Sequence, residues 1–222
     1  MSTTATVPAR TADPPKPRFR GRLHQAAFFA CIPAVVALVV VAPGAKARVG
    51  AIVYGVAILL QFASSAMYHR GEWSEQAYAN MRRLDHSMIF VLIAGTYTPM
   101  CLMALHGTVG WVVLTLAWTG AVVGILTKLY RVDLHVISGI MYVGLGWIAV
   151  FVLPALARAL SDASMILVVA GGLLYSLGAL ALATHHPDPW PETFGYHEVW
   201  HAATVAGGAC FFVAIFLMYV GR

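Results

Sequence analysis

The chain is poor in charged residues and in cysteine, and each shortage excludes a class of protein. Only 10% of its 222 residues are charged, whereas soluble domains carry about 25%. Hydrophobic residues make up 60% of the chain, and the mean hydropathy is +0.77. This composition excludes a soluble globular fold and indicates that lipid surrounds most of the chain. The three cysteines are separated and lie within apolar runs, which argues against a disulfide framework or a cysteine-based zinc site.

The amino-terminal segment is the main polar stretch. Residues 1–22 carry five of the basic residues, and Pro14, Pro15 and Pro17 disfavour a stable helix there. We therefore expect residues 1–22 to form a disordered basic tail. The apolar run that follows lacks a convincing small-residue cleavage site, so we interpret it as a retained span and not as a signal peptide.

Long apolar runs fill the rest of the chain, residues 23–222. A bilayer core takes about 20 helical residues to cross. The sequence predicts seven transmembrane helices: 24–42, 49–69, 86–105, 109–129, 134–157, 163–184 and 197–220. The fourth run carries Gly120 and Gly124, a pair of small residues suited to close helix contact. We therefore expect an all-α integral membrane protein, folded as one seven-helix bundle.

Lysine and arginine residues predict the orientation of this bundle. With the amino terminus in the cytoplasm, ten of them would lie on the cytoplasmic side and four on the opposite side. Because cytoplasmic loops carry the excess of basic residues, the count predicts a cytoplasmic amino terminus and a carboxyl terminus outside.

Ionisable and polar residues are expensive at membrane depth and mark functional sites. Ser65 and His69 are four residues apart at the inner end of the second span, and so share one face of the helix. Asp85 precedes the third span at the same depth. His197 and His201 repeat the four-residue spacing at the inner end of the seventh span. The predicted topology brings all five to one side of the membrane.

Three imidazoles with an open fourth position are the ligand set of a catalytic zinc. His69, His197 and His201 are therefore the predicted metal ligands. Asp85 is the candidate general base. Ser65 is the candidate residue for orienting His69, the zinc-bound water or a substrate carbonyl. Each residue also has a structural interpretation: Asp85 as the N-cap of the third span, Ser65 as a close-packing small residue, and single histidines as interfacial residues.

The stretch HEVWH, residues 197–201, matches the H-E-x-x-H signature of zinc proteases. No acidic residue or histidine follows His201, and Thr204 and Gly207 occupy the Gly and last-His places of the longer form of the motif. A third ligand must therefore come from upstream, where His69 is best placed. This disfavours a soluble-type protease and leaves Glu198 without its protease role.

Three motifs carry a resemblance to a known family: Ser65-x-x-x-His69, Asp85-His86 followed by IAGTYTP (93–99), and FGYHEVWH (194–201). Together they closely resemble the haemolysin III proteins, bacterial members of the progestin and adipoQ receptor (PAQR) family. The resemblance extends from about residue 20 over the seven spans. It implies zinc binding by the three histidines, an aspartate at position 85 that hydrogen-bonds the zinc water, a nearby serine, a cytoplasmic amino terminus and kinship to alkaline ceramidases.

The leading functional interpretation is a membrane-embedded zinc-dependent hydrolase of a lipid amide or ester, in a bacterial inner membrane. The alternatives are a receptor-like or membrane-homeostasis protein with structural zinc, and a cytolysin. A pore lining needs polar residues along several helices, and these spans are apolar nearly throughout. Four further histidines could serve as alternative ligands, but the family pattern does not use them, and we interpret them as loop or interface residues: His86, His135, His185 and His186.

Overall fold

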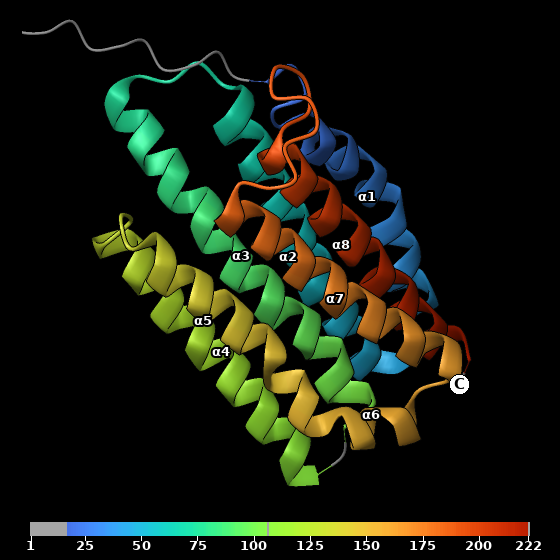
Figure 1. The fold of residues 1–222 in the computed structure, drawn as a ribbon. Helices are drawn as coiled ribbons and strands as arrows, with labels where there is room; N and C mark the ends of the chain where they lie inside the picture. The colour runs from blue at the N-terminus through green and yellow to red at the C-terminus, as the bar shows by residue number, and fades with distance from the viewer. Residues whose placement is uncertain (1–16, 106, 222) are drawn as a thin grey trace, which may run out of the picture.

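The computed structural model describes residues 17–105 and 107–221. Within this part of the chain, seven helical segments are long and apolar enough to cross a bilayer, which confirms the predicted seven-span helical bundle. In chain order the elements are α1 (Arg22–Val41), α2 (Gly44–Arg70), α3 (Glu75–Met103), α4 (Gly107–Tyr130), α5 (His135–Trp147), the 3₁₀ helix η1 (Ile148–Val152), α6 (Leu153–Ala159), α7 (Asp162–Thr184) and α8 (Tyr196–Val220). The fifth span consists of α5, η1 and α6 together (Figure 1).

Two helices begin earlier than the apolar runs predict. Helix α2 starts at Gly44 instead of residue 49, and α3 starts at Glu75 instead of residue 86. Ser74 caps α3, and its side chain accepts a hydrogen bond from the backbone N–H of Ala77. Glu75 in the first turn further favours the helix because it complements the positive end of the helix dipole. Asp85 therefore lies in the interior of α3, and the interpretation of Asp85 as its N-cap is wrong.

The fifth span is interrupted near its middle. Helix α5 ends at Trp147, and η1 leads into α6, which has Pro154 in its first turn. Proline lacks a backbone N–H and is best tolerated in the first turn of an α-helix, which is where Pro154 lies in α6.

Helices α2 and α8 are tied together along the bundle. Tyr54 on α2 donates a hydrogen bond to the backbone carbonyl of Gly208 (3.1 Å), and Tyr219 on α8 donates to the carbonyl of Ala47 (2.8 Å). Both tyrosines are fully buried. Helix α7 packs along α8, and α3 packs along α2 (Figure 1). These contacts fix the position of α2 relative to α8.

Glycines allow several of the close helix contacts. A Cβ atom at Gly124 would collide with the ring of Phe90 on α3, whereas one at Gly120 would meet Leu145 on α5. The small-residue face predicted on the fourth span therefore receives side chains from two different helices. Large apolar side chains on the outward faces are exposed, as expected for a lipid-facing surface.

The start of the described chain differs from the predicted tail. Residues 1–16 of the predicted tail lie outside the described residues. Residues 17–21 form a turn, in which the backbone N–H groups of Arg18 and Phe19 donate to the carbonyls of Glu192 and Thr193 at 3.0 Å each. Polar composition alone did not reveal this pairing, because its partner loop is distant in sequence.

Candidate metal centre

Three histidines meet where α2 ends and α8 begins. These helix ends lie at the same end of the bundle, which we call the site end (Figure 1). His69 lies in the last turn of α2, and His197 and His201 lie in the first two turns of α8. One ligand atom from each histidine lies within 4.8 Å of the other two. His69 and His197 are half-buried, and His201 is buried. The structure therefore brings together the three predicted ligands from two helices.

The chemistry and spacing of this group fit zinc. The Nε2 atoms of His69 and His197 are 3.2 Å apart. Two nitrogens that share a tetrahedral zinc at 2.0–2.1 Å are separated by about 3.3 Å. His201 has a buried Nδ1 without a hydrogen-bond partner. Three neutral imidazoles are a familiar donor set for zinc, and they leave one position of a tetrahedron for another ligand.

Asp85 and Ser65 form a pair beside the histidines. The Ser65 hydroxyl hydrogen-bonds the Asp85 carboxyl group, and both residues are buried. Asp85 Oδ1 is also buried and has no hydrogen-bond partner. Because Ser65 precedes His69 by four residues, it lies on the same face of α2, about one turn or 5.4 Å away. Asp85 is not part of the group of three histidines, and its hydrogen bond to Ser65 links it to the turn of α2 that precedes His69.

Glu198, the acidic residue of the HEVWH stretch, has partners of its own. Its Oε1 lies 2.5 Å from Nε of Arg20, and its side chain is fully buried. Its Oε2 accepts a hydrogen bond from the backbone N–H of Gly195 at 3.0 Å. Glu198 therefore anchors the segment before α1 and the start of α8, and it is not in the metal-binding group.

Three residues near the start of the described chain, in the amino-terminal turn and the first turn of α1, also lie against the site, although the sequence did not predict them there. Besides Arg20, Gly21 packs so closely that an added Cβ would lie 2.8 Å from the Cβ of His69. Its φ of +75° is itself a conformation that favours glycine. His24, in the first turn of α1, stacks on the ring of His201. The position of His24 at the start of the first apolar run was the only sequence signal for its place at the site. A single histidine at such a position is equally typical of a residue at the membrane interface.

The other histidines with described side chains lie outside the group. His185 is exposed and stacks on Tyr196, with ring centroids 4.4 Å apart. His186 is exposed and bonds the carbonyl of Thr184. The side chain of His86 is not in the group either, and its backbone carbonyl accepts a hydrogen bond from Tyr142.

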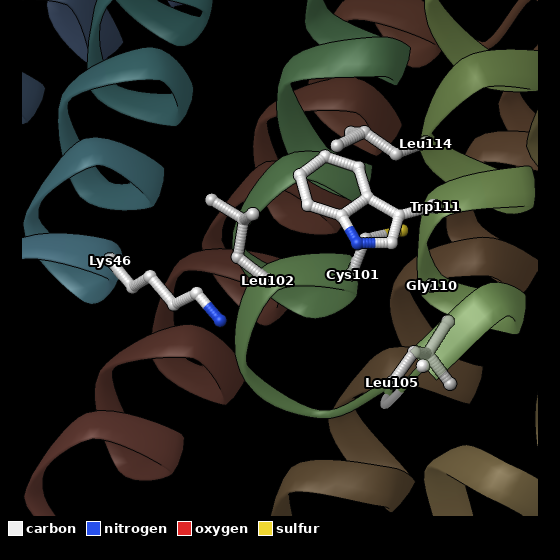
Figure 2. A pocket seen from close by; sticks show the side chains of 8 residues that line it. Lys46, Cys101, Leu102, Leu105, Gly110, Trp111 and Leu114 are labelled. Atoms are coloured by element: carbon white, nitrogen blue, oxygen red, sulfur yellow. The ribbon is translucent and has the colours of Figure 1, made fainter.

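Two hollows lie away from the histidines. A pocket of about 80 Å³ lies between the start of α2, the end of α3 and the start of α4. Lys46, Leu102 and Trp111 are among the residues that line it (Figure 2). A wider apolar groove of about 420 Å³ runs between α4 and η1. Neither is lined by any of the five predicted site residues.

Fold and site together define a helical integral membrane protein with a three-histidine cluster at one end of the bundle. The family model described as "Haemolysin-III related" matches residues 13–212. The chain is 34% identical to "Hemolysin-3" of Bacillus cereus over 193 residues, 85% of this chain and 84% of the relative. It is 32% identical to "Hemolysin-3 homolog" of Bacillus subtilis (strain 168) over 188 residues, 83% of this chain and 85% of the relative. The chain thus belongs to the haemolysin III family. No solved structure gives a significant match.

Proposed function

We propose that the chain is a membrane-embedded, zinc-dependent hydrolase of a lipid amide or ester. The observation that carries this proposal is the three-histidine group with Asp85 beside it, whose Oδ1 is buried and unpartnered. A closed structural zinc site takes four protein ligands. Among the side chains that the structure describes, the group holds three, which favours a reactive site over a structural one.

Each residue has a defined task in this proposal. His69, His197 and His201 hold the metal. Zinc, when bound, lowers the pKa of a coordinated water to about 7 and so supplies a nucleophile at neutral pH. Asp85 Oδ1 accepts the proton of that nucleophile and later delivers it to the leaving amine or alcohol. Ser65 holds the Asp85 carboxyl group and so directs its free oxygen.

The position of the site supports a lipid as the substrate. The histidines lie at the ends of membrane-spanning helices, where a lipid headgroup and the first bonds of its acyl chains are found. The exposed apolar faces of the bundle can accommodate acyl chains at the same time. The resemblance to ceramidase-related proteins favours a ceramide-like amide within this class.

Metal analysis and lipid hydrolysis test the proposal on the full-length protein in detergent. We expect one zinc per chain and strong loss of zinc in each of the His69→Ala, His197→Ala and His201→Ala variants. Hydrolysis of a panel of N-acyl and O-acyl lipids should stop with a chelator and return with zinc. Stoichiometric zinc in the triple alanine variant would reject the site. Zinc binding without turnover of any lipid in the panel would reject the reaction.

The names of the two Bacillus relatives favour cytolysis as a second candidate function. The apolar outward faces do not suit a polar pore lining. Release of dye from liposomes separates the two: a hydrolase loses its effect in the triple histidine variant, whereas a pore that does not use the metal releases dye regardless.

A further inference from the structure

We propose that His24 is a positioning residue that fixes the ring plane of the metal ligand His201. The inference rests on the zinc centre of the proposed function. The two imidazoles are stacked, with centroids 3.9 Å apart and planes 7° from parallel. His24 is only 2% exposed, and the ring of Phe62 packs against it at 5.1 Å.

A hydrogen-bond chain holds His24 in this position. Its Nε2 lies 2.9 Å from the hydroxyl oxygen of Thr204, and the Thr204 hydroxyl donates to the backbone carbonyl of His201 at 2.9 Å. With the Thr204 proton in the second bond, both bonds form in the tautomer of His24 that carries its proton on Nε2. His24 on α1 is thus fixed to the turn of α8 that carries His201.

The torsion that needs fixing is the last one of the His201 side chain. The helix backbone restricts the first side-chain torsion, but the torsion between Cβ and an imidazole ring is broad and roughly two-fold. A zinc ligand must aim one nitrogen lone pair at a point shared with the other ligands. A parallel ring at 3.9 Å blocks rotation of His201 and selects one plane.

Packing alone does not account for a histidine at this position. An apolar ring would fill the same space without burying polar atoms, and burial of an imidazole is costly unless it is hydrogen-bonded. His24 keeps a buried Nδ1 without a partner. It is also outside the group of atoms that can share one metal, so it acts through His201 and not as a ligand.

Cobalt substitution of the full-length protein tests the inference without any assay of activity, because Co²⁺ absorption in the visible range reports the ligand geometry. We compare His24→Phe, which keeps a flat ring against His201, with His24→Leu, which fills the space without one. The Leu variant should bind zinc about 10–100-fold more weakly, as for loss of other residues that orient ligands, with a shifted Co²⁺ spectrum. The Phe variant should lose less than about tenfold. Thr204→Ser should match the parent protein, and Thr204→Val should resemble the Phe variant.

The controls separate the possible failures. His186→Ala removes an exposed histidine outside the site and should leave zinc affinity and spectrum unchanged. Thermal unfolding of the metal-free variants identifies any general loss of fold. Parent-like affinity and spectrum in His24→Leu would overturn the positioning role, and so would equal losses in the Leu and Phe variants. If the parent protein binds neither zinc nor cobalt, the proposed metal centre itself fails, and the role of His24 fails with it.

Discussion

Asp85 is the residue at which a hydrolase and a structural zinc site make opposite predictions. Its carboxyl group is hydrogen-bonded to Ser65, and its Oδ1 is buried without a hydrogen-bond partner. We expect Asp85→Asn to keep the fold and most of the zinc, because the amide can still bond Ser65 and occupies the same volume. The variant loses proton acceptance, a contribution typically worth about 10²–10⁴-fold in rate. Zinc content and lipid turnover are measured together on the same preparation.

Two results would contradict the general-base role of Asp85. Zinc lost together with thermal stability would make Asp85 a direct ligand and favour the non-enzymatic interpretation. Zinc retained with unchanged turnover would show that the proton goes elsewhere. Ser65→Ala serves as the milder companion variant, since it frees the carboxyl group to rotate but leaves it able to accept a proton.

Glu198 gives a second prediction for a single residue. The H-E-x-x-H motif suggests a catalytic base, whereas the contacts of Glu198 suggest a structural role. Its buried carboxylate is paired with Arg20, whose side chain is 21% exposed. Glu198→Gln should lower the free energy of unfolding by about 1–3 kcal/mol, the cost of leaving a partly buried charge without its partner. Zinc content should not change. The measurement is the thermal unfolding midpoint in detergent beside metal analysis.

A double variant checks that the effect comes from the pair. In the Arg20→Gln background, Glu198→Gln should cost clearly less than in the parent protein, because no cation is left unpaired. A protease-type base would behave differently: the single Gln variant would keep its stability and lose turnover.

The sequence could predict polar residues that are costly at membrane depth. It could not predict residues whose role depends on contact with a helix that is distant in sequence. The three histidines were found because two short spacings and the topology place them at one level, and the structure brings them together. Ser65 and Asp85 were proposed on the same grounds, and their roles stay predictions. His24 and Arg20 were missed, because a histidine and an arginine at the start of the first span are ordinary interfacial residues until α8 is packed against them.

At the scale of helices, hydropathy predicts spans but not their full lengths. Helix α3 extends beyond its apolar run because the Ser74 cap and Glu75 in the first turn stabilise a helix start in the polar region. Helix α2 also starts earlier than its apolar run, at Gly44, without a side-chain cap. The break at η1 also escaped prediction, although Pro154 was its local signal. For the site, the longer α3 matters most, since it moves Asp85 from a helix end into a rigid helix interior.

The contact of α7 with α8 supports the helix that carries two of the three clustered histidines. A Cβ at Gly171 would lie 2.8 Å from the ring of Phe211 and 3.2 Å from the carbonyl oxygen of Gly207, whereas a Cβ at the neighbouring Gly172 would meet nothing within 4 Å. Gly171→Leu should therefore lower stability by about 1–3 kcal/mol through overpacking. It should also weaken zinc binding, because α8 must move. Gly172→Leu is the matched control and should leave the unfolding midpoint and zinc affinity unchanged. Equal behaviour of the two variants would show that this contact does not set the position of α8.

At the scale of the whole molecule, the remaining question is which leaflet holds the three-histidine group. The described basic residues are unevenly divided between the two ends of the bundle. The site end and the neighbouring α4–α5 junction carry Arg18, Arg20, Arg22, Arg70, Arg82, Arg83, Lys128 and Arg131, whereas the opposite end carries Lys46, Arg48 and Arg158. Because basic residues are retained on the cytoplasmic side, we expect the site end to face the cytoplasm of a bacterial cell and the substrate to come from the inner leaflet.

Reporter fusions test this orientation directly. Alkaline phosphatase is active only outside the inner membrane, and a green fluorescent protein exported through it stays dark. A phosphatase fused after α8 should be active and a fluorescent protein there dark, while a fluorescent protein inserted in the loop at residues 71–74, between α2 and α3, should fluoresce. Reversal of both results would place the histidines at the outer leaflet. The proposed zinc chemistry would survive that outcome, but its substrate would then be a lipid of the outer leaflet.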